Sequence, residues 1–234
     1  MDDVEHDPGT VAPSPLEPAW PLFGLRIRSE RLVLRLPTDD DLPAMLALAK
    51  QGIHPPEEMP FGVAWTDETG SAFDRGYLQH HWRWRGSWRV DEWWLNLMVE
   101  FEGAPIGAQT ISGEQFLLHR TVDSGSWLGQ AFQGRGFGKE MRSAVLSFAF
   151  DALGARVATS SAFLDNAASN AVSRSLGYVD DGHGALAPRG VSRETQRFRM
   201  TGEIWRSRPR PPVAIEGFEA CREMFGLDDP ESPT

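Results

Sequence analysis

Short stretches of alternating apolar and polar residues predict β-strands in this chain. The alternation is found at 25–36, 95–101, 121–130, 155–164 and 191–200. In the first stretch Ser29 and Glu30 disturb the alternation, so a break in the strand is expected there. After the second stretch, Glu102 and Gly103 form a short turn, which predicts a hairpin with a return strand.

Apolar residues at helical spacing predict two helices between the first strand and the hairpin. Thr38 and Asp41 stand at capping-box spacing before the first helix, and Thr66 is expected to cap the second. The apolar stripe of the first helix consists of Leu42, Met45, Leu46 and Ala49. One face of the second helix is expected to carry Phe73, Tyr77, His81 and Trp84.

Two more helices are predicted in the second half of the chain. One begins at Phe137 and stops near Gly154, and the other is capped by Asp165 or Asn166 and ends at Gly177. Strands and helices are therefore mixed, which predicts an α/β (α+β) single domain with a mixed sheet. The strand-helix-strand portion at 121–164 is expected to form a parallel pair with a right-handed crossover.

Composition excludes several classes of protein. The chain has 234 residues, of which 41% are hydrophobic and 24% charged, as in an ordinary soluble globular protein. The net charge of −10 argues against a nucleic-acid binder. No apolar run is long enough for a membrane span and no signal peptide is recognisable, which predicts a cytoplasmic protein. Cys221 is the only cysteine, so neither an intrachain disulfide nor a thiolate metal cluster is expected.

The chain is expected to contain one folded domain between two appendages. Residues 1–21 are acidic and rich in proline, which is typical of a disordered or loosely ordered leader. Residues 22–202 hold the predicted strands and helices. Residues 203–234 form a proline-rich connector and a C-terminal extension with a short predicted helix.

Glycines alternate with other residues at 134–138, where a predicted strand gives way to a helix. A Walker A loop would need a glycine at Gln133, and a dinucleotide fingerprint would need one at Lys139, so both patterns fail. The pattern Gln/Arg-x-x-Gly-x-Gly/Ala fits completely. Successive backbone amides and the positive end of a helix dipole at this place predict a cradle for a pyrophosphate. A glycine-rich turn without a ligand remains the alternative.

A second segment carries a family resemblance. "DNAASNAVSRSLGY" resembles the second signature of the GCN5-related N-acetyltransferases (GNAT), with Asn166, Ser169, Gly177 and Tyr178 at the signature positions. The segments "SERLVLRLPTDDDLPAMLAL" and "GSWLGQAFQGRGFGKEMRSAVL" look like the branch that contains the ribosomal-protein N-terminal acetyltransferases. The resemblance covers about residues 25 to 200. It implies a mostly antiparallel sheet with a parallel pair at an acyl-CoA site, flanked by helices.

The resemblance implies an acyl-CoA donor, either acetyl-CoA or another acyl-CoA such as succinyl-CoA, and no metal. Backbone amides at 134–139 would hold the pyrophosphate, the backbone of 127–129 would pair with the pantetheine arm, and Asn166 and Ser169 would contact that arm. The implied cofactor residues are Trp127, Leu128, Gly129, Gln133, Gly134, Arg135, Gly136, Phe137, Gly138, Lys139, Asn166 and Ser169.

The implied reaction is direct attack of a neutral amine on the thioester, through a tetrahedral oxyanion that an amide near Leu128 or Gly129 stabilises. A base has to remove the proton of the amine, often a carboxylate that acts directly or through water, and water alone is the other option. Asp123 and then Glu114 are the candidate carboxylates, and either is equally compatible with a solvated surface acid. Ser173 stands where relatives often have a tyrosine that protonates the thiolate. Serine is a poor acid, so this departure weakens the two-residue scheme.

The acceptor is expected on the loop and helix that follow the first helix. Acidic and aromatic side chains there suit a cationic amine, although much of the aromatic content is equally compatible with core packing. The candidate residues are Glu57, Glu58, Phe61, Trp65 and Trp84. The acceptor would be a small-molecule amine or an amino group of a protein or peptide.

The sequence therefore predicts an acyl-CoA-dependent N-acyltransferase. The alternative is a catalytically idle acyl-CoA-binding module with a regulatory role, and the serine at position 173 is its main support. The C-terminal segment and the nine tryptophans are compatible with a homodimer, which the sequence does not establish.

Overall fold

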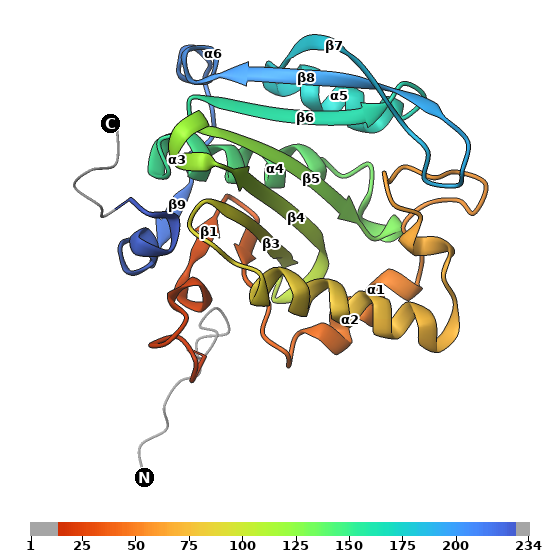
Figure 1. The fold of residues 1–234 in the computed structure, drawn as a ribbon, viewed down its shortest axis with the longest axis horizontal. Coiled ribbons are helices and arrows are strands. Elements are labelled where there is room, and N and C mark those ends of the chain that lie inside the picture. The colour runs from red at the N-terminus through yellow and green to blue at the C-terminus, as the bar shows by residue number, and fades with distance from the viewer. Residues whose placement is uncertain (1–13, 228–234) are drawn as a thin grey trace.

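The computed structural model of the protein describes residues 14–227. Within these residues the chain forms a nine-stranded sheet in the order β7-β8-β6-β5-β4-β3-β2-β1-β9 (Figure 1). The strands are β1 (Arg26–Arg28), β2 (Leu32–Arg35), β3 (Glu92–Phe101), β4 (Ala104–Glu114), β5 (Thr121–Leu128), β6 (Val157–Phe163), β7 (Val179–Leu186), β8 (Arg193–Thr201) and β9 (Ala214–Glu216). The helices are α1 (Leu42–Lys50), α2 (Gly70–Gly86), α3 (Phe116–His119), α4 (Phe137–Ser147), α5 (Ala167–Leu176) and α6 (Gly202–Ser207).

The sheet is mixed, as the sequence predicts. β5 and β6 pair in parallel, and the other strand pairs in the described chain are antiparallel. The predicted turn between β3 and β4 is confirmed: Glu102 and Gly103 have φ values of 52° and 76°, the left-handed pair that a tight hairpin requires. The predicted break at Ser29 and Glu30 separates β1 from β2, which pair as a second hairpin.

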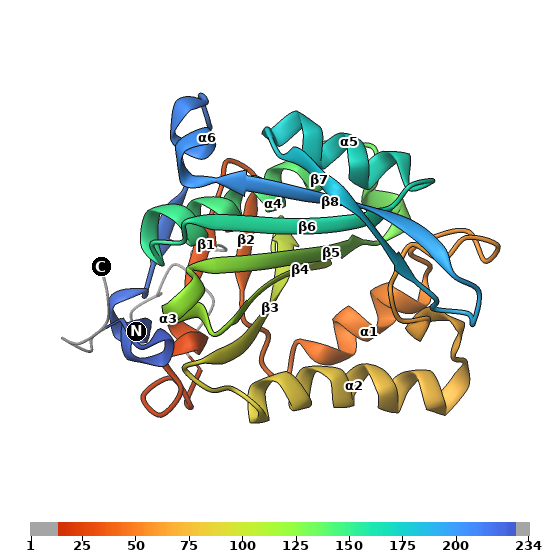
Figure 2. The same cartoon turned by 45° about the horizontal axis from the view of Figure 1, so that its top comes forward.

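Helices cover both faces of the sheet (Figures 1 and 2). Helices α4 and α5 lie on one face, where residues such as Val99 and Val145 belong to the main hydrophobic core. Helices α1 and α2 lie on the other face, where a smaller core contains Met98, Met45 and Phe73. Successive strand residues point to opposite faces, so Met98 and Val99 belong to different cores. We refer to the two sides as the α4 face and the α1–α2 face.

Two predicted helix starts differ from the structure. The second helix begins at Gly70 after Thr69, because Thr66 lies in a short 3₁₀ turn and its hydroxyl bonds His54 Nε2 at 2.7 Å. At α1 the helix begins at Leu42, and the Asp41 carboxylate accepts the backbone N–H and the hydroxyl of Thr38 at 2.7 and 2.8 Å. The predicted pair therefore interacts, but it closes the turn that precedes the helix.

The two chain ends are packed more closely than the sequence suggests. Residues 1–13 of the predicted leader lie outside the described residues, whereas 14–21 form turns and Trp20 packs edge-on against Trp88. At the other end, β9 pairs with β1, and Phe218, Cys221 and Phe225 are buried in the main core. The segment 203–227 therefore continues the sheet and core of the domain.

Replacing Phe225 by alanine should destabilise the whole domain. Its ring is fully buried against Trp88, Trp93 and Phe148, with centroid distances of 5.3, 5.0 and 5.9 Å. We expect a loss of about 3–5 kcal/mol in the free energy of unfolding, measured with urea. Leu118→Ala is the control, because that side chain is 74% exposed. Equal effects of the two substitutions would contradict the structural role of the C-terminal segment.

Candidate active site

The parallel strands β5 and β6 separate halfway along their length. Their ladder ends where Asp123 pairs with Thr159, although β5 continues to Leu128 and β6 to Phe163. Beyond that point β5 stays with β4 and β6 stays with β8, so the two strands diverge toward their carboxyl ends (Figure 1). We call the space between residues 124–128 and 160–163 the wedge.

The register of β5 shows which backbone groups face the wedge. Gly129 N–H donates to the Ile106 carbonyl of the β4 side at 3.0 Å, and alternate residues of an antiparallel strand direct their amides to the same neighbour. The backbone N–H and C=O groups of Trp127 therefore point toward β4. The backbone N–H groups of Ser126 and Leu128 point toward the wedge. Of the two amides expected near an oxyanion, the Leu128 amide faces the wedge and the Gly129 amide is already bonded.

The glycine stretch opens onto α4 beside the wedge. Gly134 and Gly136 have φ values of 72° and 83°, a left-handed conformation that other residues adopt only with strain. A Cβ at Gly134 would meet no atom within 4 Å, and one at Gly138 would lie 3.8 Å from Leu128. The amides at the start of this 11-residue helix therefore lie next to exposed backbone, an arrangement that fits a pyrophosphate.

Polar side chains around the bend fix its shape. Gln133 Nε2 donates to the carbonyls of Ile53 and Leu128 at 2.7 and 2.8 Å, so this predicted cofactor residue uses its side chain to hold the loop to the end of β5. Glu140, in the first turn of α4, accepts from Ser29 and forms an ion pair with Arg31 at 2.6 Å. Those partners lower the pKa of Glu140 in spite of its partial burial, and they offset its negative charge.

Several other cationic side chains lie near this bend. The guanidinium of Arg135 lies over the Phe137 ring, 5.0 Å from its centroid. A groove of about 310 Å³ runs from Gly136 and Lys139 along α4 to Arg208. Sequence reasoning did not connect Arg208 to this site, because the segment that carries it resembles a proline-rich connector.

The second signature forms the start of α5. Asn166 is the N-cap of this helix, and its side-chain oxygen accepts the Ser169 N–H at 3.1 Å. The capping interpretation of Asn166 is therefore confirmed. The neighbouring Asn170 is buried and donates to the Phe163 carbonyl at 2.9 Å, which ties α5 to the end of β6.

Asp123 lies where the two strands part, on the α1–α2 face. It pairs across the sheet with Ser112 and Thr159, and its carboxylate accepts the Thr159 hydroxyl at 2.7 Å. The carboxylate reaches solvent, yet the surrounding protein removes enough hydration to raise its pKa. The Thr159 hydrogen bond and the charge of Arg142 oppose that increase.

The backbone leaves open space beside Asp123. Gly125 is exposed on the same face, and a Cβ at this position would meet no atom within 4 Å. The half-buried Trp127 follows two residues further along β5 and packs near Trp65 at 6.1 Å. A substrate could therefore approach Asp123 over Gly125, with aromatic rings on one side.

The other two predicted catalytic residues lie in different surroundings. Glu114 is the last residue of β4, and it is exposed. It lies two residues beyond Ser112, the partner of Asp123, and therefore beside the part of β5 that is still paired with β6. Ser173 is fully buried on the sheet-facing side of α5, and its hydroxyl has no hydrogen-bond partner. Asp123 is therefore the predicted carboxylate that stands at the wedge.

The predicted acceptor residues do not form one cluster. Phe61 and Trp65 pack together at 5.3 Å beside the α1–α2 core, whereas Glu57 and Glu58 are exposed on the same loop. Trp84 lies near the other end of α2, about 16 Å from Phe73 along a helix that rises 1.5 Å per residue. The structure separates Trp84 from the other four residues.

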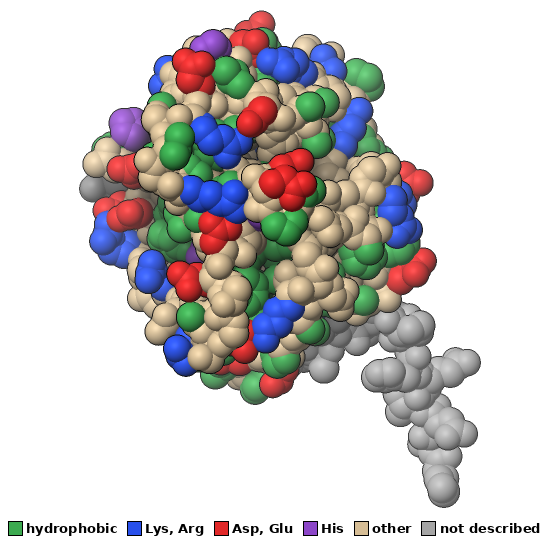
Figure 3. All heavy atoms as spheres, turned by 90° about the vertical axis from the view of Figure 1, so that its right-hand side faces the viewer, with side chains coloured by type: hydrophobic (Ala, Val, Ile, Leu, Met, Phe, Trp, Pro, Cys, Tyr) green, Lys and Arg blue, Asp and Glu red, His purple; other side chains and the backbone are tan. Residues whose placement is uncertain are grey.

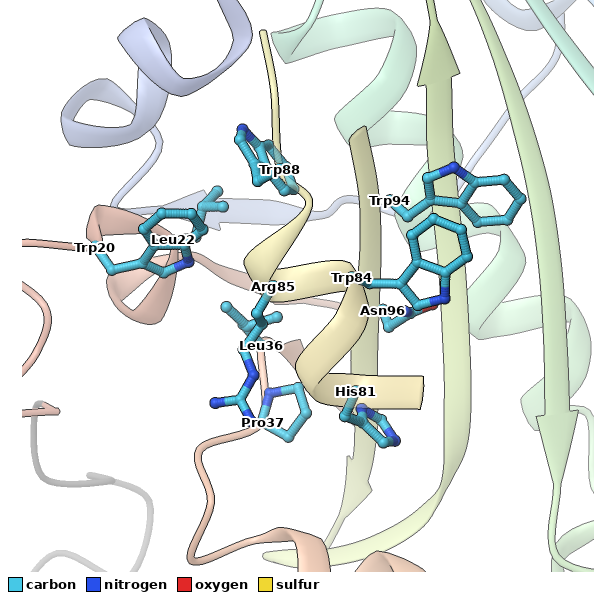
Figure 4. Close-up of a pocket in the computed structure, with 10 residues that line it drawn as sticks. All are labelled: Trp20, Leu22, Leu36, Pro37, His81, Trp84, Arg85, Trp88, Trp94 and Asn96. Carbon is cyan, nitrogen blue, oxygen red and sulfur yellow. The ribbon is translucent and has the colours of Figure 1, made fainter. Parts of the chain in front are cut away.

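Trp84 belongs to a small pocket between α2 and β3 (Figure 4). It stacks on Trp94 at 4.4 Å, and the pocket has a volume of about 10 Å³, room for roughly one water molecule. His81 is buried there, and loss of hydration lowers its pKa to about 3, so it is neutral at physiological pH. Trp94 shares a row with Ser112 and Asp123 on the α1–α2 face.

The hairpin of β7 and β8 holds the loop at 52–67, where the acceptor was predicted, in place, a contact that the sequence analysis missed. Arg189 forms a bidentate ion pair with Asp67 at 2.6 and 2.7 Å, and Arg193 donates to the Met59 carbonyl at 2.7 Å. Figures 1 and 2 show the hairpin and the loop at 52–67 side by side. The face toward which β5 and β6 point carries mixed acidic, basic and hydrophobic side chains (Figure 3).

This combination of a parted parallel pair and a glycine bend can be compared with known proteins. The family model described as an acetyltransferase (GNAT) domain matches residues 31–179. The chain belongs to this GNAT acetyltransferase family. The match covers the wedge, the glycine bend and the second signature, so the family resemblance seen in the sequence is confirmed.

Solved structures with the same fold share little sequence with this GNAT protein. RimJ of Mycobacterium smegmatis, in complex with CoA-disulfide, is 19% identical with a TM-score of 0.62, and the alignment covers 80% of this chain and 88% of RimJ. A chimera of the spermidine N-acetyltransferase SpeG from Vibrio cholerae and hSSAT is 17% identical with a TM-score of 0.60, over 76% and 100% of the two chains. The microcin self-immunity acetyltransferase MccE, in complex with acetyl-CoA and AMP, is 18% identical with a TM-score of 0.56, over 74% and 93%.

Between residues 14 and 227 no helix is both long and apolar enough to cross a membrane. In the same residues, no three His, Cys, Asp or Glu side chains stand close enough together to hold a metal ion.

Gly136→Glu should abolish CoA binding, because the new carboxylate would stand at the start of α4 where the anion is expected. Calorimetry with CoA measures this loss. Gly190→Glu is the matched control: Gly190 has a similar φ of 76° and lies in the β7–β8 turn. A Cβ at Gly190 would meet no atom within 4 Å, and one at Gly136 would contact only Arg31, at 3.5 Å. Unchanged CoA affinity in Gly136→Glu would rule out the cradle, and loss in both variants would indicate backbone strain.

Proposed function

We propose that this protein is an N-acyltransferase that moves an acetyl group, or a related short acyl group such as succinyl, from acyl-CoA to a primary amine. The observation that carries this proposal is the wedge, which places the free Leu128 amide next to the glycine bend. A strand edge without a partner suits an extended arm that carries amides. The bend suits the phosphates at the other end of that arm.

This chain's own residues would bind and orient the donor. Amides at 134–139 would bind the pyrophosphate, and Lys139 and Arg208 would attract the anionic nucleotide end along the groove. The backbone of Ser126 and Leu128 would pair with the pantetheine arm in the wedge. The Leu128 amide would then donate to the carbonyl oxygen of the thioester. Acyl-CoA supplies that thioester, whose carbonyl carbon an amine can attack.

Asp123 would serve as the general base. A protonated amine has no lone pair for the attack, so a carboxylate beside the acceptor has to take up its proton. Asp123 is accessible, stands where the wedge begins and has open space over Gly125 beside it. Its raised pKa makes it a stronger base than an ordinary aspartate.

The acceptor would be a primary amine that reaches Asp123 across the α1–α2 face. Aromatic surface lies on both sides of Gly125. On one side it comes from Trp65 and Trp127, and on the other side from Trp84 and Trp94. Aromatic faces and a carboxylate attract an amine that arrives as a cation. The structurally similar spermidine acetyltransferase chimera is consistent with this class of acceptor.

Thiol release from acetyl-CoA and succinyl-CoA, measured with a panel of small amines and peptides, tests the proposal. Turnover with at least one acceptor would support it. CoA binding without thiol release for any acceptor would favour the idle CoA-binding module instead.

Asp123→Asn should lower kcat/KM for the acceptor by about 10²–10⁴, the range expected for loss of a general base. Asp123 must be ionised to act, so the parent's rate falls as the pH drops through its raised pKa, and the variant should lack that acidic limb. Asparagine can still accept from Thr159, so CoA affinity and the Tm at pH 7 should not fall.

The control for this substitution is Asp181→Asn, which removes an exposed carboxylate from β7. Its pH–rate profile should match that of the parent. An acidic limb that persists in Asp123→Asn would show that another group is the base.

Gly125→Val should block the acceptor while it leaves the donor site intact. Two methyl groups would fill the open space between Asp123 and Trp127, whereas the wedge lies at the strand edge. We expect the acceptor KM to rise about tenfold or more with unchanged CoA affinity, and Gly125→Ala to give a smaller increase in KM. The same acceptor KM in all three proteins would mean that the amine approaches from elsewhere.

A further inference from the structure

Arg142 is a buried cation whose partners are all neutral. It lies on the sheet-facing side of α4 and is 4% exposed. Its guanidinium donates to the hydroxyls of Ser160 at 2.9 Å and Ser126 at 3.4 Å, and its buried Nε has no hydrogen-bond partner. Within residues 14–227, no carboxylate lies within 4.0 Å of it.

Such a group needs an explanation. A guanidinium keeps its charge in proteins, and a buried charge without a counter-charge opposes folding. Aliphatic residues would pack against the strands at this position without that penalty, as the neighbouring Met141 and Val145 do in the main core. The arrangement therefore suggests that the charge has a function beyond packing.

The guanidinium lies across the closed end of the wedge, on the α4 face. Ser126 belongs to β5 and Ser160 to β6, and both follow the last ladder pair, Asp123 with Thr159. Arg142 therefore joins the two strands where they begin to part. Asp123 lies on the opposite face of the same junction, so the cation and the proposed base flank the same end of the wedge.

Other polar atoms on this side of the wedge also have no partner. The Ser173 hydroxyl and Asn170 Oδ1 are buried and make no hydrogen bond in the described structure, and the buried Tyr178 hydroxyl lies close to Ser124 and Arg142. The charge of Arg142 acts to lower the pKa of two titratable groups. They are Asp123 on β5 and Tyr178, which follows α5. Burial raises the pKa of Tyr178, and the nearby Arg142 charge only partly opposes this, so the phenol holds its proton tightly.

These groups match the requirement of one step in the proposed reaction. The lone pair of the amine nitrogen forms a C–N bond to the thioester carbon, the C–S bond breaks, and its electron pair goes to sulfur. Asp123 passes the proton that it removed from the cationic amine before the attack to solvent, which its carboxylate reaches, and then takes the proton that nitrogen loses after the attack. Sulfur thus becomes an anion, while Ser173 is a poor acid and Tyr178 holds its proton. A fixed cation can stabilise that anion without giving up a proton.

We propose that Arg142 is a further catalytic residue, an inference that rests on the proposed function. Its guanidinium would lie against the sulfur of the acyl-CoA and stabilise the departing thiolate. Ser126 and Ser160 hold the guanidinium in place from the two strands. The unpartnered hydroxyl of Ser173 lies on the helix side of the wedge and is free to donate to the same sulfur.

Titration of the CoA thiol in its complex with the protein tests this role directly, because a thiolate absorbs in the ultraviolet and a thiol does not. The pKa of the bound thiol should be at least about one pH unit lower in the parent than in Arg142→Met, since a nearby cation favours the charged form. Arg142→Lys should be intermediate. We expect kcat of Arg142→Met to fall about tenfold or more, with CoA affinity within about threefold of the parent.

Arg174→Met is the matched control, because Arg174 is an exposed arginine on α5. It should leave the thiol pKa and kcat unchanged. Arg142→Met should also unfold at the same or a higher temperature than the parent in the absence of CoA, since it removes an unpaired buried charge. If Arg142→Met does not fold, Arg142→Gln provides the same comparison in a polar side chain.

The outcomes separate this inference from the proposed function. If the parent does not bind CoA, the proposed function fails. If the parent binds CoA and the thiol has the same pKa in the parent and in Arg142→Met, only the role of Arg142 fails. A loss of activity confined to succinyl-CoA would also overturn the inference, because it would show that Arg142 binds the carboxylate of the acyl group instead.

Discussion

The separation of β5 from β6 is the constraint on which the rest of this structure depends. Three residue pairs join these parallel strands, whereas six join β5 to β4 and seven join β6 to β8. Each strand therefore follows its antiparallel partner once the shared ladder ends. Twist accumulates between neighbouring strands, so two strands with different partners diverge. The gap opens at the carboxyl ends of the strands, where helices α4 and α5 begin.

The two faces of this gap have different chemical characters. On the α1–α2 face, Asp123 reaches solvent beside open space at Gly125. On the α4 face, the groups are buried, and the cation Arg142 has only hydroxyl partners. In the mechanism that we propose, Asp123 takes up protons on the solvent-exposed face and Arg142 stabilises negative charge on the buried face. The sheet itself keeps the base and the cation from forming an ion pair, which would weaken both.

Much of the fold follows from local sequence signals. The turn at Glu102 and Gly103 and the cap at Asn166 were predictable, because each depends on residues close together in the chain. The parallel pair was predictable because a strand-helix-strand unit usually closes with a crossover between parallel strands. Strand β7 was missed, since its exposed residues and its glycines break the alternation. Contacts between distant segments, such as Arg189 with Asp67, leave no periodic signal in the sequence.

The site could be predicted only in part, for a related reason. The pattern of glycines pointed to the bend, and the family resemblance pointed to Asp123. Arg142 was missed because an arginine in a helix ordinarily indicates an exposed position. Only the structure shows that its side chain is buried and bonds to two strands. The choice between the Leu128 and Gly129 amides likewise required the strand register.

The pairing of β9 with β1 affects how the protein folds during synthesis. Arg28 and Glu216 form an ion pair across these strands although they are 188 residues apart in the chain. Until the last part of the chain leaves the ribosome, the edge of β1 and the pocket for Phe225 have no cover. The nascent chain would therefore expose an unpaired sheet edge until synthesis is complete. Such edges promote aggregation and are bound by chaperones.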